Sequence, residues 1–247
     1  MSNPRRVQQH PAYLLHHRPF RETSLLLDIF SRDHGRFALV ARGARAQKSR
    51  LKALLRPFMP LQLSWLLRSD LGTLTGAEID GRPLSLSGDG LMSGYYLNEL
   101  LLHLLHRHDP QPEVFAAYGQ TIQRLAGTGD PAPALRVFEI ELLKLLGYAA
   151  TFAHEAETHD AVDPGANYEY RPEQGPVKVN RVSGPMIFSG ATLIAIGQQR
   201  FDDPDVLRSA SRLLKNIIGH HLGGKELKSR KVLVDLYRSR VKMVADR

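Results

Sequence analysis

Residues 25–40 read LLLDIFSRDHGRFALV, and this stretch decides the fold of the first part of the chain. Two apolar runs, residues 25–30 and 37–40, flank the polar segment SRDHGR. Gly35 lies in that segment and can adopt the positive φ that tight turns require. The pattern therefore predicts two antiparallel strands joined by a short hairpin connection.

Three further runs of the same kind lie on either side of this stretch, at residues 13–16, 61–67 and 74–79. The segment LRSDLGT joins the last two runs and predicts a second hairpin. Short strands in a row, separated by turn residues, are typical of a small barrel of the OB type. We therefore expect a five-stranded barrel within residues 1–80.

Beyond residue 80 the apolar residues recur with the period of a helix. Helices are expected over LMSGYYLNELLLHLLHRH, PEVFAAYGQTIQRLAG and PALRVFEIELLKLLGY, and again at residues 191–198, 204–221 and from 226 to about 243. Between these two groups only NYEYR and VKVNRV resemble strands.

The predicted fold class is therefore α+β, with an N-terminal five-stranded OB-type barrel followed by a C-terminal helical bundle that contains an irregular insertion. The predicted domains are the barrel at residues 1–80, the helical domain at residues 81–147 and 189–247, and the insertion at residues 148–188.

Charge is unevenly distributed along the 247 residues, whose formal net charge is +8. Thirteen basic and six acidic side chains lie in residues 1–80, eight and thirteen in residues 81–199, and twelve and six in residues 200–247. The two basic ends indicate an acidic partner, although charge alone does not distinguish DNA from RNA or from an anionic membrane.

The densest basic stretch is residues 32–56, where eight cations are accompanied by a single acid, Asp33. Six of the eight are arginines, whose planar guanidinium group suits phosphate. A solvated charge run is the alternative, but the nearly uniform sign favours contact with nucleic acid. The predicted DNA-binding residues are Arg32, Arg36, Arg42, Arg45, Lys48, Arg50, Lys52 and Arg56.

Two further features extend this prediction. Phe20 lies between Arg18 and Arg21 and is our candidate for stacking against a base, since OB surfaces that hold single strands combine cations with aromatic rings. The C-terminal helix carries a second basic stripe, for which DNA contact and a solubilising role are both open. Its predicted DNA-binding residues are Lys228, Lys231 and Arg238.

Motifs for catalysis are missing from the sequence. No G-x-S-x-G elbow is present, and GGKELKSR lacks the upstream glycine and spacer of a Walker A motif, so Gly223 and Gly224 are interpreted as a helix stop. The chain has no cysteine, and its histidine clusters at residues 103–108 and 154–159 lack a second set of metal ligands. We therefore expect no enzymatic activity, no cofactor and no metal. A cytoplasmic location is expected because no secretory signal or membrane-length apolar run is found.

Several motifs, in order along the chain, carry a resemblance to a known family. They are AYLLHHRPFRETSLLLDIFSRDHGRFALVARGAR, KS, LLRPF and Trp65 in the first part, and YYLNELLLHLL, a DP joint, ALRVFEIELLKLLGY and LGGKELKSR in the second. The sequence resembles the RecO family of bacterial recombination mediators over nearly its whole length. The resemblance implies a non-enzymatic, nucleoid-associated protein that binds single- and double-stranded DNA and anneals complementary strands. It also implies that the protein works with RecR and single-stranded-DNA-binding protein to load RecA.

The resemblance has consequences for particular residues. Many relatives carry a four-cysteine zinc site just after LGY, where this chain has FAHEAETHDAVDPG, so zinc is not carried over. The acidic, apolar C-terminal tail of single-stranded-DNA-binding proteins needs an arginine at the edge of a groove. Arg136 is the first candidate and Arg124 the second, while an intrahelical pair of Arg136 with Glu139 is the alternative.

Two other classes of function were weighed against this one. An RNA-binding or ribosome-associated OB-fold protein stays open as the alternative. A phosphodiester hydrolase with a basic groove would need clustered carboxylates for its metal ions, and the sequence does not offer them.

Overall fold

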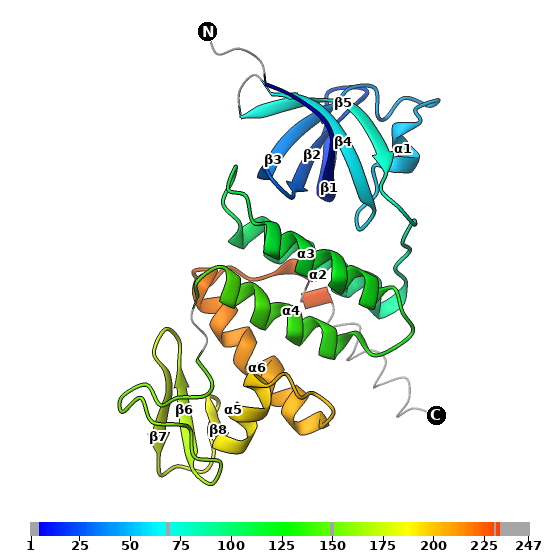
Figure 1. Cartoon of the computed structure of the whole chain (residues 1–247). Helices are drawn as coiled ribbons and strands as arrows, with labels where there is room; N and C mark the ends of the chain where they lie inside the picture. Colours follow the sequence, from blue (N-terminus) through cyan, green and yellow to red (C-terminus); the bar gives the residue numbers. More distant parts are fainter. Residues whose placement is uncertain (1–4, 68–69, 149–150, 230, 233–247) are drawn as a thin grey trace. The chain divides into compact units, whose positions relative to one another are not determined.

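Figure 1 shows a computed structural model of the chain, which describes residues 5–67, 70–148, 151–229 and 231–232. The chain forms two compact units. The first unit comprises the residues up to Gly129 and those from Leu227 onward. The second unit comprises residues 130–226.

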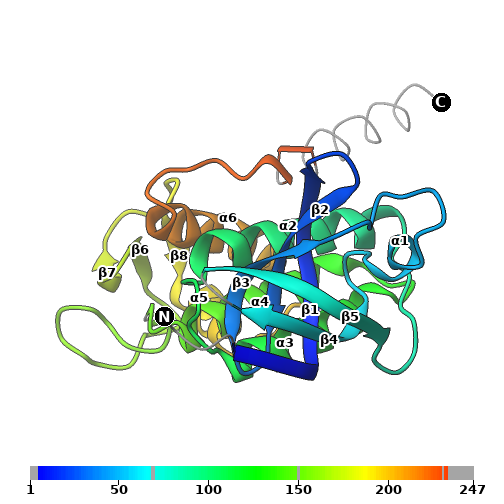
Figure 2. The same ribbon diagram turned by 90° about the horizontal axis from the view of Figure 1, so that it is seen from above.

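The first unit begins with five strands and one short helix, which are β1 (Arg5–Phe20), β2 (Ser24–Ser31), β3 (Gly35–Ala41), α1 (Leu51–Leu54), β4 (Pro60–Leu67) and β5 (Leu71–Ile79). The strands close into a barrel in the order β1-β2-β3-β5-β4, which Figure 2 shows from above. Neighbouring strands are antiparallel except for β3 and β5, which run parallel. The predicted five-stranded OB-type barrel is confirmed.

The barrel core is filled by the inward-facing residues of these strands, because successive side chains of a strand point to opposite faces. Leu27, Ile29 and Leu39 are fully buried, and Trp65 is 1% exposed. Burial of each such side chain contributes about 1.5–3 kcal/mol of transfer free energy. The apolar side chains that predict the β2–β3 hairpin from the sequence therefore also stabilise it, because they are buried in the barrel core.

Gly35 begins β3 with a φ of 66°, as the predicted hairpin connection requires. A Cβ atom at this position would lie 2.2 Å from the backbone oxygen of Asp109, so a close approach also demands glycine here. The backbone N–H of His108 donates to the carbonyl oxygen of Arg36 at 2.9 Å. The β2–β3 turn is thus covered by the segment that follows α2 (Gly88–Leu104).

β1 is much longer than the strand predicted at residues 13–16. Its first half pairs with β4 and its second half with β2, with irregularities between Val7 and His10 and between Leu14 and His16. The polar ends of β1 do not alternate in hydrophobicity, so backbone pairing extends the strand where the sequence pattern gives no signal.

α2 and α3 (Pro112–Leu125) pack on the barrel within the first unit. The side-chain amide of Asn98 donates to the carbonyl oxygen of Leu15 at 2.8 Å, and the Tyr118 hydroxyl donates to Asn98 Oδ1 at 2.6 Å. The ring of Tyr118 also lies edge-on to that of Tyr13, with centroids 4.9 Å apart. These contacts group α2 and α3 with the barrel in one compact unit. The predicted domain boundary at residue 80 stays a prediction.

The second unit contains α4 (Pro131–Leu145), β6 (Asn167–Arg171), β7 (Gly175–Val179), β8 (Ile187–Ser189), α5 (Gly190–Gly197) and α6 (Pro204–His221). Its strands form an antiparallel sheet in the order β7-β6-β8, and α4 and α5 both contact α6. Asp130, Ser189 and Asp203 cap the three helices with their side-chain oxygens.

Residues 148–188, expected to form an irregular insertion, contain most of this small sheet. NYEYR is β6, and the first residues of VKVNRV belong to β7. The predicted helix at residues 204–221 is confirmed as α6. The helix expected from residue 226 to about 243 lies mostly outside the described residues. Among the described residues, every helix is too short or too polar to span a membrane.

Candidate nucleic-acid interface

The second half of the cationic run forms an exposed surface after β3. Its side chains are all exposed, and no ion pair in the described part of the chain involves any of them. They keep their charge available for phosphate, since no neighbouring carboxylate neutralises it. We call this set the loop cations; it consists of Arg42, Arg45, Lys48, Arg50, Lys52 and Arg56.

The backbone that carries the loop cations is fixed against the turn between β1 and β2. The backbone N–H of Arg45 donates to the carbonyl oxygen of Thr23 at 2.8 Å, and its guanidinium donates to the carbonyl oxygen of Arg21 at 3.3 Å. Ala44, the residue before Arg45, is 1% exposed. The loop is therefore held by backbone hydrogen bonds while its charges face solvent.

This bracing brings further basic residues beside the loop cations. Arg18 and Arg21 belong to the β1–β2 hairpin and are both exposed, and the guanidinium of Arg21 lies 5.4 Å from the centre of the Phe20 ring. Phe20 itself is partly buried. OB folds use this first hairpin loop to bind oligonucleotides. Arg18 and Arg21 were not predicted from the sequence as DNA-binding residues. Their position on either side of the stacking candidate Phe20 could have indicated this role.

Two cations of the predicted set are already engaged elsewhere. Arg32 donates to both carboxylate oxygens of Asp33, at 2.9–3.2 Å, and this bonding holds the pKa of Asp33 below its usual value. Arg36 donates from Nε and Nη2 to the carbonyl oxygen of Leu105, at 3.2 and 3.1 Å. Burial, together with the charge of Arg107, lowers the pKa of Arg36. The Arg36 side chain thus joins the barrel to the end of α2, and its contact with DNA stays a prediction.

The C-terminal stripe is only partly described. Lys228 and Lys231 are exposed, and Arg238 lies outside the described residues. The carboxylate of Glu99 accepts hydrogen bonds from the backbone N–H of Lys228 at 3.0 Å and from the backbone N–H and hydroxyl of Ser229 at 2.8 and 2.5 Å. Glu99 therefore fixes the start of this basic segment on α2.

The candidate anchor in the second unit, Arg136, is buried at 6% exposure. Its Nη2 donates to Oε1 of Glu139 at 2.9 Å, so the intrahelical pair expected as the alternative is present. Within the described residues, its Nε and Nη1 atoms are buried and have no hydrogen-bond partner. Arg124, at the end of α3, is exposed.

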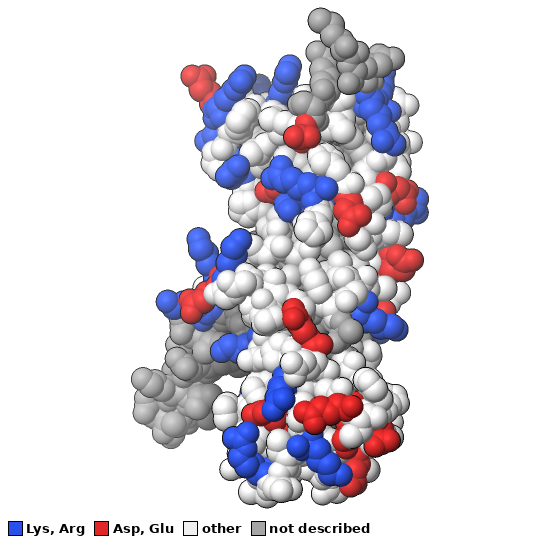
Figure 3. All heavy atoms as spheres, turned by 90° about the vertical axis from the view of Figure 1, so that its left-hand side faces the viewer, with Lys and Arg blue, Asp and Glu red and all other residues white. Residues whose placement is uncertain are grey.

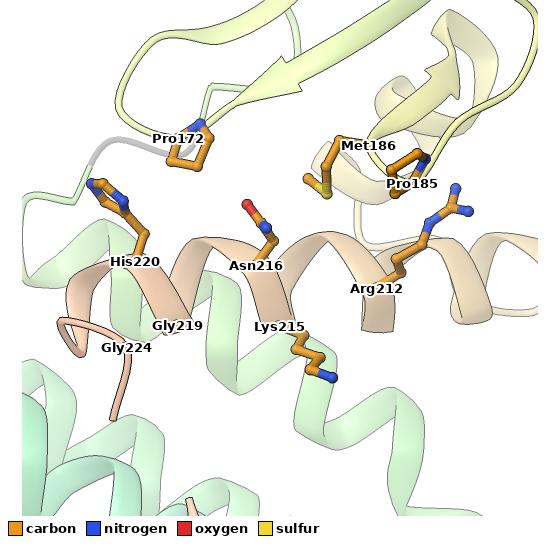
Figure 4. A pocket seen from close by; sticks show the side chains of 9 residues that line it. All are labelled: Pro172, Pro185, Met186, Arg212, Lys215, Asn216, Gly219, His220 and Gly224. Atoms are coloured by element: carbon orange, nitrogen blue, oxygen red, sulfur yellow. The ribbon is translucent and has the colours of Figure 1, made fainter. Parts of the chain in front are cut away.

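The second unit also carries a groove of about 690 Å³ between α6 and the loops of the small sheet (Figure 4). Arg212 lies at this groove, donates to the carbonyl oxygen of Ile187 at 3.2 Å and has its guanidinium 4.5 Å from the centre of the Phe188 ring. The lining residues are Pro172, Pro185, Met186, Arg212, Lys215, Asn216, Gly219, His220 and Gly224.

Figure 3 shows the charged side chains on one face of the molecule. Lys and Arg form several groups over the barrel, with acidic side chains beside some of them. Over the unit that holds the small sheet, acidic and basic side chains are intermixed.

The donor set does not fit the zinc site that the resemblance raises. No group of three or more potential ligands comes together in the described part of the chain, and the sequence has no cysteine. In the segment concerned, the backbone of His154 forms a β-bridge with Ala161, and the pair of His154 and His159 falls short of the four ligands of a structural zinc.

Comparison with known proteins places these features in a family. The family model described as Recombination protein O N terminal matches residues 5–81, and the model described as Recombination protein O C terminal matches residues 86–231. A protein named DNA repair protein RecO from Dechloromonas aromatica is 41% identical over 237 residues, which cover 94% of this chain and 97% of that protein. Proteins of the same name from Methylococcus capsulatus and Aromatoleum aromaticum are 43% and 44% identical, with 96% of this chain covered in each comparison and 96% and 99% of the two relatives.

Proposed function

Because the chain belongs to the RecO family of DNA repair proteins, we propose that it acts in recombinational repair as a non-enzymatic mediator that anneals complementary DNA strands. The observation that carries this proposal is the exposed set of loop cations, which has no acidic partner among the described residues and is braced against the β1–β2 turn. Such a surface neutralises phosphates without reading bases.

Annealing requires two like-charged strands to approach each other. A protein with two basic surfaces lowers this repulsion, since each surface neutralises one phosphate backbone. The loop cations are the first surface, and the segment that starts at Lys228 and includes Lys231 is the second. Glu99 holds the start of the second surface on α2, so both belong to the first unit. Neither surface calls for nucleotide or divalent metal, and we expect the protein to associate with the nucleoid.

The proposed partners follow from the family. We expect RecR and single-stranded-DNA-binding protein to bind directly, and the loading of RecA to be the indirect result. For the acidic tail of single-stranded-DNA-binding protein, the two buried guanidinium nitrogens of Arg136 support an anchor in α4. Buried donors without an acceptor are costly, and a carboxylate is their strongest acceptor. Arg124 is the exposed alternative.

The test of annealing uses two complementary oligonucleotides that carry donor and acceptor dyes, in chelator and without ATP. We expect the protein to raise the pairing rate, and the Lys228→Ala, Lys231→Ala, Arg238→Ala triple variant to lose annealing more than single-strand binding. Pairing rates that do not depend on protein concentration would contradict the proposal, and an absolute need for ATP would show that a nucleotide site exists. Competition between single-stranded DNA and RNA of one sequence tests the RNA-binding alternative.

The tail proposal has its own test. The Arg136→Met, Glu139→Gln double variant removes the anchor together with the carboxylate charge that is buried beside it. We expect a synthetic acidic, apolar tail peptide to lose affinity for this variant and to bind the Arg212→Ala control normally. Peptide affinity that survives in the double variant would remove Arg136 as the anchor.

A further inference from the structure

A small pocket opens in the first unit, where β1 begins and β4 ends. Its volume is about 150 Å³. This is well below the roughly 300–1,000 Å³ of pockets that hold drug-sized ligands, so an occupant must be small. The residues that line it are Arg5, Val7, Asp33, His34, Phe37, Trp65, Leu67, His108 and Pro110.

Aromatic rings form much of the pocket wall. Trp65 lines the pocket and is nearly fully buried, and the ring of His34 meets it edge-on, with centroids 5.2 Å apart. The ring of His108 stacks on Phe37, with centroids 6.0 Å apart and planes 21° from parallel. His34 is partly exposed and His108 is exposed, so these two imidazoles are the rings that a ligand reaches first. Unstacked bases bind to proteins by stacking on aromatic or histidine rings of this kind.

The charges around the pocket fit a nucleotide better than an acidic peptide. Arg5 lines the pocket and is exposed, and the exposed Arg107 is the chain neighbour of the lining residue His108. These cations suit a phosphate backbone that passes the mouth. The Asp33 carboxylate within the lining would repel an acidic side chain, whereas it accepts hydrogen bonds from the amino groups of bases.

We propose that this pocket receives one unstacked nucleobase of a bound DNA single strand, with His34 and His108 stacking on it and Arg5 contacting its phosphate. The proposal rests on the proposed function, because it needs a strand bound to the first unit. It assigns a second contact point on the barrel, at the opposite end of β2 from the β1–β2 turn. The seven residue steps along β2 between these ends correspond to about 23 Å.

The chain contains a single tryptophan, and it lies in this pocket, so intrinsic fluorescence reports on the site alone. The full chain is titrated with an oligonucleotide and, separately, with an oligonucleotide of equal length and charge whose sugars carry no bases. Dye anisotropy on each oligonucleotide measures binding independently. We expect both to bind and only the base-bearing strand to quench Trp65.

The outcomes separate the two proposals. Binding of the base-bearing strand without any change at Trp65, or equal quenching by the abasic strand, overturns the pocket and leaves the proposed function standing. If neither strand binds, the proposed function is contradicted, and so is the proposal that the pocket receives a base of a bound strand. A third titration with a deoxynucleoside monophosphate then shows whether the pocket takes free nucleotide instead, which would also overturn the assignment to a strand.

Variants test the stacking rings. The His34→Ala variant should weaken binding of a short oligonucleotide by at least about fivefold, since stacking on one ring accounts for roughly that factor or more. The matched control is His106→Ala, which removes an exposed histidine of the same unit that does not line the pocket. Equal affinities for the two variants, at equal melting temperatures, would contradict the role of His34.

Discussion

The loop cations of the first unit differ from two exposed arginines of the second unit in how they are paired. Arg181 is 2.9 Å from Glu169, and Arg171 is 3.2 Å from the same carboxylate. Among the described residues of the first unit, the loop cations make no such pair. A cation that is already neutralised releases no counterion from DNA. Pairing, and not only the number of basic residues, therefore distinguishes the loop cations from Arg171 and Arg181 as a surface for phosphate.

The largest effect is expected where a cation of the second unit is buried with its acid. Arg136→Met breaks the 2.9 Å ion pair with the Glu139 carboxylate, which is at 0% exposure, and should cost about 3 kcal/mol or more of unfolding free energy. Urea unfolding at pH 7 measures the loss. The Arg136→Met, Glu139→Gln double variant should recover most of it, because the buried charge is gone. A double variant as unstable as the single one would mean that the loss does not come from the carboxylate.

The next effect sharpens the comparison on the DNA side. Arg42→Ala combined with Arg45→Ala should reduce the slope of log affinity against log salt by about 1.4–1.8, because each engaged phosphate accounts for roughly 0.7–0.9. At about 0.1 M salt this corresponds to tens-fold weaker binding. The control is Arg171→Ala combined with Arg181→Ala, which removes two cations that are already paired. If the control flattens the slope as much as the loop variant does, the comparison between the units is broken.

Arg36 gives a smaller effect, and it separates structure from DNA contact within the first unit. Arg36→Ala removes two hydrogen bonds to the carbonyl oxygen of Leu105 and should cost about 1–2 kcal/mol of unfolding free energy. The salt slope of DNA binding should stay that of the unchanged protein. Chemical denaturation and binding titrations on the same preparation check both statements. A flatter slope with unchanged stability would return Arg36 to the DNA surface.

Arg36 also shows what the sequence could and could not predict. The apolar alternation of residues 25–40 predicts β2, β3 and their turn, because burial of one strand face leaves a periodic signal. Nothing local to Arg36 reveals that its guanidinium meets the carbonyl oxygen of Leu105, since that contact depends on where α2 ends. A run of cations in a sequence therefore gives candidates for DNA binding. The tertiary fold decides which of them stay exposed and which make contacts within the protein.

The small sheet and the pocket, like the contact of Arg36, could not be predicted from local sequence patterns. β8 has three residues and depends on pairing with β6, so its own sequence carries little signal. The pocket combines Arg5, Trp65 and His108, which come from three separate parts of the chain. Local sequence patterns do not predict contacts between residues that are so far apart in the chain. Helix α6, by contrast, follows directly from its strong amphipathic period.

Glu99 offers a finer test, because this acid of the first unit binds backbone N–H groups instead of a cation. Burial alone would raise its pKa, but hydrogen bonds from Ser229 and Lys228 hold the pKa below its usual 4.5. The folded protein thus binds this proton less readily than the unfolded chain does. The stability that results is fully present above pH 4.5 and is lost as the pH falls through the lower folded pKa.

Glu99→Gln should therefore lose about 0.5–1.5 kcal/mol at pH 7, and its difference from the unchanged protein should shrink as the pH falls below 4.5. Urea midpoints measured from pH 7 down to about pH 3 give this difference directly. Glu22→Gln, at an exposed carboxylate of the same unit, is the control. A Glu99→Gln difference that stays constant or grows toward low pH would contradict the assigned direction of the pKa shift.

The smallest effect is expected from chelation, and it concerns the segment of the second unit after LGY, where the resemblance raises a zinc site. A structural zinc site takes four ligands, mostly thiolates, and its binding energy is folding energy. This chain has no cysteine, and the two histidines of the segment after LGY do not make up that set. We therefore expect a strong chelator to leave the melting temperature of the purified protein unchanged, with elemental analysis far below one zinc per chain. Zinc near one per chain, lost together with stability on chelation, would show that the second unit uses carboxylates and histidines to hold a metal as well as to neutralise its cations.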